Sequence, residues 1–401
     1  MARFAPRLLS VSTPEHAAHE LRRIEVDSYG IVEMVPKMRT LCIGLSALEC
    51  RQANILKQEM LSVGGDAAVA RGTVACSISG TDCVLIGTAK QLARLGRKLA
   101  VQPFGLSELG MELNLLLANI TTSPAEWKTS HRSLSLQRPL IMGILNVTPD
   151  SFSDGGRSSD PDRAFEKAIQ MEAEGADIID IGGESTRPGA AMVSADDEIA
   201  RIIPVIERLA GALKCAISVD TWKSDVAGRA LSAGAEIIND ISGFTFDPQM
   251  AALAAGSGAG VVLMHTRGTP DKMQQDTGYS DLMAEITTGL RASVAKAHEA
   301  GVSGKCLAVD PGIGFGKDAA GNLELIRRLE ELSVLGLPIL TGPSRKSFIG
   351  KVLGRELTDD RIFGTAAAVA LSVSHGASIL RVHDVLAMRD VADMAHAVMH
   401  S

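Results

Sequence analysis

The chain of 401 residues is long enough for one large domain and one smaller domain. A hydrophobic content of 46% with 22% charged residues is typical of a globular protein, and 3% aromatic residues are too few for nucleic-acid stacking platforms. The net charge of −7 is uneven, because residues 1–138 hold 16 Lys and Arg against 12 Asp and Glu, and residues 139–401 hold 24 against 35. By its bulk charge the acidic larger part is not a nucleic-acid binder.

Targeting and redox signals favour the cytoplasm. The N-terminal stretch MARFAPRLLSVSTPEH lacks the apolar segment of a secretory signal. The most apolar windows, near 250–264 and 364–380, are broken by Gly or His and are too short to span a bilayer. The six cysteines form no CxxC pair and no metal-like spacing, which is typical of reduced thiols. We therefore expect a cytoplasmic protein without membrane contact.

Residues 1–125 predict a small mixed α/β domain. Helices are expected over 14–23, after a Thr13 cap, over 51–61 and from Lys90 onward. Strands are expected at 41–43, 74–77 and 84–86. The helix from Lys90 presents basic and leucine-rich faces; the basic face could meet an acidic surface, including that of this chain's own larger part, but a solvated helix face is the better explanation. Residues 126–138 are polar, with few apolar residues, and predict a linker.

From residue 139 to 401, short apolar runs alternate with longer amphipathic segments. The runs are 140–145, 177–182, 215–219, 236–239, 260–264, 306–309, 337–340 and 378–382. The segments between and after them, near 161–175, 196–212, 223–233, 248–257, 280–300, 320–333, 360–374 and 384–398, have the length and pattern of helices. Eight such units predict a (β/α)8 TIM barrel rather than an open doubly wound sheet. The GIGFG at 312–316 has the wrong spacing for a dinucleotide fingerprint.

The expected strands end in polar residues. In a barrel the site is built at the carboxyl ends of the strands. The polar residues at these ends are Asn146, Glu184, Asp220, Asn239 with Asp240, His265, Asp310, the 344–347 run SRKS, and Arg381 with His383. Each alone could be a helix cap, but all eight strands end this way. The sequence therefore predicts one site at this edge.

These residues form two groups that suit two kinds of ligand. Asp220, Asn239, Asp310 and Lys346 suit a flat heterocycle with a donor edge beside a carbonyl, because a carboxylate accepts two parallel N–H bonds. Arg187, Arg381, His383 and Asn146 suit a phosphate or diphosphate, with Asn146 available to Mg²⁺. For a single Arg, an ion pair with a neighbouring acidic residue would be a sufficient explanation. Four such groups at neighbouring strand ends favour an anion site.

Eight ordered motifs resemble those of the dihydropteroate synthase family. They are GILNVTPDSFSDGG, DIGGESTRPGA, SVDTWKSDVA, IINDISG, MHTRGTP, DPGIGFGK, GPSRKSFIG and RVHDV. The resemblance covers roughly residues 138–398 and leaves residues 1–130 outside the family's catalytic core. It implies a transferase of folate biosynthesis that joins 6-hydroxymethyl-7,8-dihydropterin diphosphate to 4-aminobenzoate, releasing diphosphate and 7,8-dihydropteroate. It also implies a target of sulfonamides. We expect a homodimer, although the residues themselves do not indicate the oligomeric state.

The resemblance also implies a role for each site residue. The pterin would contact Asp220, Asn239, Asp310 and Lys346, with Met264, Ile241 and Phe315 lining its pocket. Diphosphate would contact Asn146, Thr186, Arg187, Arg381 and His383, with Mg²⁺ on Asn146. The 4-aminobenzoate would contact Pro188, Phe315, Lys346 and Ser347. The residues expected to take part in catalysis are Asp310, Lys346, Arg381, His383 and Asp154.

The chemistry favours a dissociative displacement. An aniline nitrogen is a weak nucleophile, whereas an electron-rich dihydropterin supports positive charge on its exocyclic methylene, so diphosphate would leave first. The resemblance implies that loops 147–156 and 185–191 close over the site, and such closure would exclude water. A pterin-dependent methyltransferase would not need the STRPG, SRKSFIG and RxH motifs. A non-catalytic pterin-binding protein would not need Arg187, Lys346, Arg381 and His383.

Overall fold

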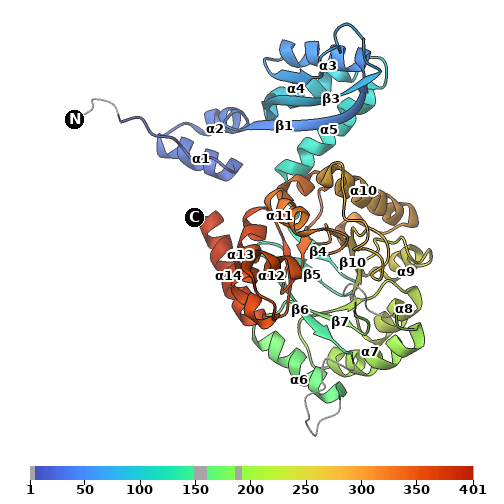
Figure 1. The fold of residues 1–401 in the computed structure, drawn as a ribbon. Coiled ribbons are helices and arrows are strands. Elements are labelled where there is room, and N and C mark those ends of the chain that lie inside the picture. Colours follow the sequence, from blue (N-terminus) through green and yellow to red (C-terminus); the bar gives the residue numbers. More distant parts are fainter. Residues whose placement is uncertain (1–4, 149–159, 186–191, 401) are drawn as a thin grey trace. The chain divides into compact units, whose positions relative to one another are not determined.

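The computed structural model describes residues 5–148, 160–185 and 192–400 (Figure 1). The chain divides into two compact units, Met1–Thr122 and Ser123–Ser401. Among the described residues, no helix is long and apolar enough to cross a membrane. All six cysteines are free thiols, as expected.

The first unit packs helices against one face of a small antiparallel sheet. Its strands are β1 (Thr40–Glu49), β2 (Asp66–Val69) and β3 (Gly80–Thr88), in the order β1-β3-β2. Its helices are α1 (Pro14–Arg23), α2 (Ser28–Met34), α3 (Cys50–Ser62), α4 (Ala89–Leu99) and α5 (Leu106–Thr121), with a 3-10 turn, η1, at Val35–Lys37. The expected Thr13 cap is present, since its side chain accepts from the His16 amide. The leucine face of α4 is fully buried in the core of this unit.

One expected strand of the first unit is wrong. Residues 74–76 lie in a run of turns, Ser77 belongs to no strand, and the third strand is β2 instead. Gly72 and Cys76 both have positive φ, at 99° and 48°. The amides of Cys76 and Ser77 donate back to the carbonyls of Thr73 and Gly72 at 3.1 Å. These local hydrogen bonds replace a strand ladder.

The second unit is a closed (β/α)8 barrel, which confirms the expected fold class. The strands are β6 (Leu140–Asn146), β7 (Ile178–Gly182), β8 (Ala216–Asp220), β9 (Ile237–Asp240), β10 (Gly260–Met264), β11 (Leu307–Asp310), β12 (Leu340–Thr341) and β13 (Ile379–Val382). They are parallel, in the order β11-β10-β9-β8-β7-β6-β13-β12. A parallel bridge between Val309 and Ile339 joins the two ends of this order. The sheet therefore has no free edge.

Helices surround the sheet (Figure 1). They are α6 (Asp160–Ala173), α7 (Ala195–Ala210), α8 (Ser224–Ala233), α9 (Met250–Ser257), α10 (Leu282–Ala300), α11 (Ala319–Arg327), α12 (Ser347–Leu353), α13 (Ile362–Ser374) and α14 (Val385–Met399). Among the described residues, the 3-10 turns η3 (Gly304–Cys306), η4 (Leu329–Leu335) and η5 (Asp359–Arg361) lie in the connections. The largest apolar core lies between the strands and these helices. Because strands and helices alternate, every carboxyl end of a strand faces the same side of the barrel.

A short hairpin occupies the segment that was expected to be a linker. Strands β4 (Glu126–Lys128) and β5 (Ser133–Ser135) pair antiparallel, and Trp127 on β4 is fully buried. Trp127 packs with the first residues of several barrel strands, including Leu140, Ile178 and Ile379. Its indole Nε1 donates to the Cys306 carbonyl at 2.8 Å. Residues 126–135 therefore close the amino-terminal end of the barrel interior rather than link two domains.

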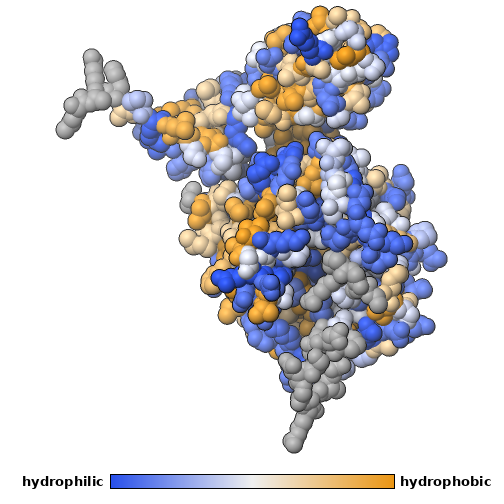
Figure 2. All heavy atoms as spheres, in the orientation of Figure 1, coloured by the Kyte–Doolittle hydropathy of each residue, from blue (hydrophilic) through white to orange (hydrophobic). Residues whose placement is uncertain are grey.

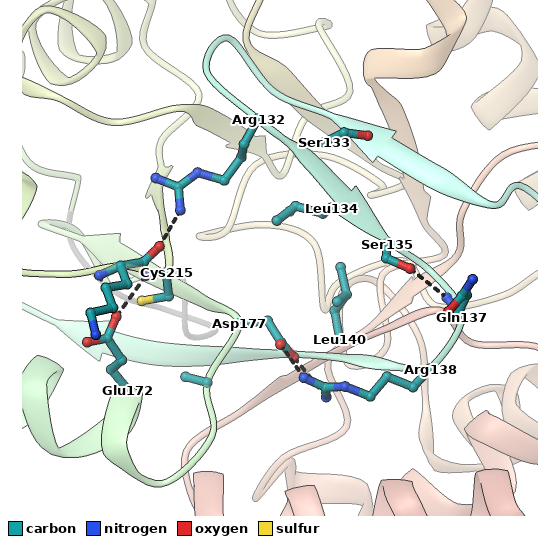
Figure 3. Close-up of a pocket in the computed structure, with 12 residues that line it drawn as sticks. Arg132, Ser133, Leu134, Ser135, Gln137, Arg138, Leu140, Glu172, Asp177 and Cys215 are labelled. Atoms are coloured by element: carbon teal, nitrogen blue, oxygen red, sulfur yellow. Dashed lines mark hydrogen bonds and ion pairs between the residues drawn. The ribbon is translucent and has the colours of Figure 1, made fainter.

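A groove of about 860 Å³ lies beside this hairpin (Figure 3). Arg138 Nη2 pairs with Asp177 Oδ1 at 2.6 Å, and Arg132 donates to the Lys214 carbonyl. Glu172 Oε1 accepts from the Cys215 amide at 2.7 Å. These charged groups satisfy one another, and the groove lies at the end of the barrel opposite the carboxyl ends of the strands. It is therefore not the predicted site.

Candidate active site

The barrel brings the predicted polar residues to one edge. Asn146, Asp220 and Asp310 are the last residues of β6, β8 and β11, and Asn239 is the penultimate residue of β9. The parallel register sets Asp220 beside Asn239 on the neighbouring strand. The buried apolar residues that precede them fix each strand end in the core. These side chains are thus held by rigid elements, as a binding site requires.

Arg381 on β13 holds two carboxylates across the top of the barrel. Its Nε donates to Asp180 Oδ2 at 2.6 Å, and its Nη2 donates to Asp220 Oδ2 at 2.6 Å. Asn239 Nδ2 donates to the same Asp180 oxygen at 3.1 Å. The sequence argument assigned Arg381 to diphosphate, whereas here its guanidinium binds carboxylates on the expected pterin side. Asp180 was not among the predicted site residues, although a carboxylate inside a buried strand was a signal for it.

Two carboxylate oxygens of this cluster have no partner among the described residues. They are Oδ1 of Asp180 and Oδ1 of Asp220, both buried. Burial raises the pKa of Asp220 to about 7, against the opposing effect of Arg381. Burial also raises the pKa of Asp310 to about 6, although its carboxylate accepts from the Gly312 amide at 2.7 Å. Unpaired buried acceptors are costly, so these oxygens are suited to a ligand with N–H donors.

An apolar wall stands beside the carboxylates. Ile241, Met264 and Phe315 form one buried cluster together with Met273 and the partly buried Trp222. The first three were predicted to line the pterin pocket, and the structure brings them together. Met273 was not predicted, because no spacing links it to a strand end. A flat ring placed against this wall would be shielded from water on one side.

Lys346 lies next to this wall and begins a short helix. Its Nζ lies 4.2 Å from the centroid of the Phe315 ring. Lys346 is the N-cap residue of α12, and Ser347 is the first residue of that helix. The preceding Arg345 has a φ of 58°, and its Nε and Nη2 bind the Asp384 carboxylate at 2.9 and 2.5 Å. This bidentate pair holds the turn that positions Lys346 and Ser347.

His383 follows β13 and is held by Ser344. Its Nδ1 lies 3.0 Å from Ser344 Oγ, which also accepts from the His383 amide at 3.2 Å. Burial, with the positive charge of Arg381, lowers the pKa of His383 to about 3. The imidazole is therefore neutral at neutral pH and can contribute a hydrogen bond to an anion but not a charge.

Lys317 supports the Gly-rich segment after β11, a role that sequence reasoning missed. Its Nζ is buried and donates to the carbonyls of Gly312 and Phe315 at 3.0 and 2.9 Å. Burial lowers the pKa of Lys317 to about 7. Only its place at the end of DPGIGFGK connected it with the site in the sequence. Its bonds fix the turn that carries Phe315 beside Asp310.

Asn146 faces the same space through a glycine on the neighbouring strand. A Cβ placed on Gly182 would lie 3.6 Å from Asp220 Oδ2 and 3.8 Å from Asn146 Oδ1. Glycine here keeps open the space between the amide and the carboxylate. Among the described residues, no group of three or more His, Cys, Asp or Glu could hold a metal ion. Asp154, Thr186, Arg187 and Pro188, which were predicted from the sequence, lie outside the described residues.

Comparison with known proteins agrees with this site. Residues 142–383 match the model of the pterin binding enzyme family. The dihydropteroate synthase of Synechocystis sp. is 48% identical over 262 residues, which cover 65% of this chain and 91% of the relative. A probable bifunctional folylpolyglutamate synthase/dihydropteroate synthase of Halobacterium salinarum is 45% identical over 338 residues. This alignment covers 84% of the present chain, more than the second unit alone, and 40% of the relative.

Solved structures give the same result for the barrel. A Xanthomonas albilineans dihydropteroate synthase with 4-aminobenzoic acid has a TM-score of 0.66 and 43% identity, covering 70% of this chain and 100% of that chain. A Yersinia pestis dihydropteroate synthase in a sulfonamide drug complex has a TM-score of 0.66 and 42% identity, covering 69% and 100%. The fold, the polar strand ends and these relatives agree. The chain belongs to the dihydropteroate synthase family of pterin-binding enzymes.

Proposed function

We propose that the barrel condenses 6-hydroxymethyl-7,8-dihydropterin diphosphate with 4-aminobenzoate, giving 7,8-dihydropteroate and diphosphate. The observation that supports this most is the buried set of Asp180, Asp220 and Asn239 around Arg381, with two unpaired carboxylate oxygens. The relatives supply the reaction class, since the enzymes of Synechocystis sp. and Bacillus subtilis are both dihydropteroate synthases. Chromatographic detection of 7,8-dihydropteroate from the two substrates tests the proposal, and the absence of this product would refute it.

On the pterin side, carboxylates and the apolar wall act together. Asp220 would accept from the donor edge of the ring, while Asn239 and Asp310 would fix its remaining polar atoms. Phe315 and Met264 would cover the ring. The carboxylate of Asp310 would also stabilise the positive charge that develops on the dihydropterin as its bond to diphosphate breaks. The rigid strand ends supply this arrangement before any substrate arrives.

On the anion side, Arg381 would change partners. In the structure its guanidinium pairs with Asp180 and Asp220. We propose that the N–H edge of the pterin replaces it on Asp220, and that Arg381 then binds the diphosphate. Neutral His383 would add a hydrogen bond, and Asn146 with Thr186 and Arg187 would complete the contacts. This exchange couples pterin recognition to stabilisation of the leaving group.

A magnesium ion fits the donors at this edge. Asn146 offers one amide oxygen next to open space, and Mg²⁺ commonly takes one or two protein oxygens together with phosphate oxygens and water. We propose that Asn146 and the diphosphate would hold Mg²⁺, which when bound neutralises charge on the departing diphosphate. The C–O bond would break first, and the 4-aminobenzoate amine would then attack the methylene and lose a proton. Lys346, Ser347, Phe315 and Pro188 would orient this amine.

We further propose a homodimer through the last helices of the barrel. Figure 2 shows apolar side chains gathered on the side of the barrel where α13 and α14 lie in Figure 1. Phe363 on α13 and Met394 on α14 are 85% and 66% exposed. Leu371, Leu386 and Val398 on the same two helices are also exposed. Large exposed apolar patches support an interface between subunits. The cytoplasmic location expected from the sequence stays a prediction.

A further inference from the structure

Lys223 occupies a buried position that the reaction chemistry does not use. It follows Asp220 by three residues, just before α8, and 11% of its side chain is exposed. Its Nζ donates to Glu198 Oε2 at 2.6 Å, Glu184 Oε2 at 2.9 Å and the Val193 carbonyl at 2.8 Å. An ammonium has three N–H donors, so this geometry uses all of them.

The three acceptors lie on the connection between β7 and α7 or near the start of α7. Glu184 lies just after β7, and Val193 lies just before Ser194, the N-cap of α7. Glu184 Oε1 also accepts from the Val193 amide at 2.7 Å. Lys223 and Glu184 together therefore tie the point at which the chain leaves β7 to the point at which it enters α7. We name Lys223, Glu184, Glu198 and Val193 the Lys223 clasp.

The Lys223 clasp is connected to the proposed pterin residues. The Lys223 amide donates to Thr221 Oγ1 at 3.3 Å, and the Thr221 amide donates to the Asn239 carbonyl at 3.1 Å. Thr221 directly follows Asp220. A buried cation shared by two carboxylates contributes little to stability compared with apolar packing. A role in holding these backbone points is the better explanation for its retention in the core.

We infer that Lys223 is a positioning residue for the diphosphate and 4-aminobenzoate contacts of the reaction. This inference rests on the proposed function, which assigns Thr186 and Arg187 to diphosphate and Pro188 to 4-aminobenzoate. These three residues are attached between Glu184 and Val193, the two points that the Lys223 clasp fixes. Loss of the clasp should therefore weaken the use of 4-aminobenzoate more than the binding of the pterin, whose ligands lie on separate strand ends.

The test compares three Lys223 variants and one control variant of the full chain with wild type. Lys223→Met removes the ammonium and leaves two buried carboxylates without it. Lys223→Met with Glu198→Gln removes the same three bonds but keeps the net charge of the cluster, so it guards against misfolding from unpaired charge. Lys223→Arg keeps the charge but cannot point three N–H groups at the same acceptors. Lys305→Met, which changes an exposed lysine paired with Glu126, is the matched control.

The measurements are the KM for 4-aminobenzoate, kcat, and the affinity for a pterin analogue by calorimetry. In the double variant we expect the KM to rise roughly tenfold or more, while pterin affinity stays within about threefold of wild type. The expected order of KM values is wild type and Lys305→Met lowest, Lys223→Arg intermediate and the double variant highest. Any other order, or an equal loss of pterin affinity, would overturn the inference. Wild type without activity would instead refute the proposed function.

Discussion

Replacing Trp127 by Ala should destabilise the barrel strongly without changing its catalytic site. The indole is fully buried against the amino-terminal residues of the barrel strands, and its Nε1 donates to the Cys306 carbonyl. Truncating a buried Trp costs about 3–5 kcal/mol through lost burial and the cavity left behind. The unpaired carbonyl adds about 1 kcal/mol where water does not reach it. We therefore expect a loss of about 4–6 kcal/mol, a large part of a typical domain stability of about 5–15 kcal/mol.

Urea unfolding followed by tryptophan fluorescence measures this loss. The chain has 2 Trp, both in the barrel unit, so the signal reports on the barrel rather than on the first unit. Trp222 remains as the probe in the variant. Trp127→Phe should fall between wild type and Trp127→Ala, because it keeps most of the apolar volume but not the N–H donor. Leu134→Ala, a partly buried neighbour on β5, should cost less.

Two results would contradict this reasoning. A loss below about 1 kcal/mol in Trp127→Ala would mean that the hairpin does not close the barrel core. A large change in KM for either substrate, in protein that is still folded, would mean that the hairpin influences the opposite end of the barrel.

Three further predictions follow from the site and the surface. Arg381→Ala should raise the free-energy barrier to turnover by about 2–4 kcal/mol and should also lower thermal stability, because Asp180 and Asp220 lose their shared partner. Asn146→Ala should lower turnover and leave thermal stability unchanged. Steady-state kinetics and thermal melts measure the two properties. Affinity for a pterin analogue that does not titrate should fall below pH 7 by up to about tenfold per pH unit, because protonated Asp220 loses an acceptor. In Asp220→Asn, calorimetry should show this fall only below about pH 6, where Asp310 becomes protonated. Phe363→Glu should shift the chain to a monomer in sedimentation, whereas unchanged mass would rule out this interface.

The sequence predicted the barrel well because its signal is periodic. Eight apolar runs alternate with amphipathic segments. The bounds of each run differ from those of the observed strand by one to a few residues. Once the barrel was predicted, the polar residues at the strand ends could be placed together, because parallel strands have their carboxyl ends on one side of the barrel. Asn146, Asp220 and Asp310 could thus be assigned to one edge without coordinates. Their common edge is a consequence of topology, not of any single motif.

Pairings across the barrel could not be predicted in the same way. Arg381 and Asp180 are far apart in the chain, and no spacing rule indicates that a guanidinium of one strand will bind a carboxylate of another. Polar composition also misled the reading of residues 126–138, because the buried side chains of Trp127 and Thr129 tie this segment to the barrel although Ser130, Ser133 and Ser135 are exposed. A fragment that begins near Ser133 would lack β4 and Trp127, so Ser123 is the better starting point for an isolated barrel.

The first unit is not explained by the catalytic site. Its sheet and helices form a core of their own. The alignment with the Halobacterium salinarum relative extends beyond the barrel into this unit. Its basic residues on α4 include Lys98, which pairs with Glu59 of the same unit at 2.5 Å. This pair supports the expectation of a solvated helix face.

The most direct test of the central claim is diphosphate release by the purified wild-type chain in the presence of Mg²⁺. The dihydropterin diphosphate is supplied with and without 4-aminobenzoate, and diphosphate and 7,8-dihydropteroate are measured in the same samples. We predict equal amounts of both products, formation that requires 4-aminobenzoate, and competition by a sulfonamide. Diphosphate release without dihydropteroate, or no release with both substrates present, would contradict the account.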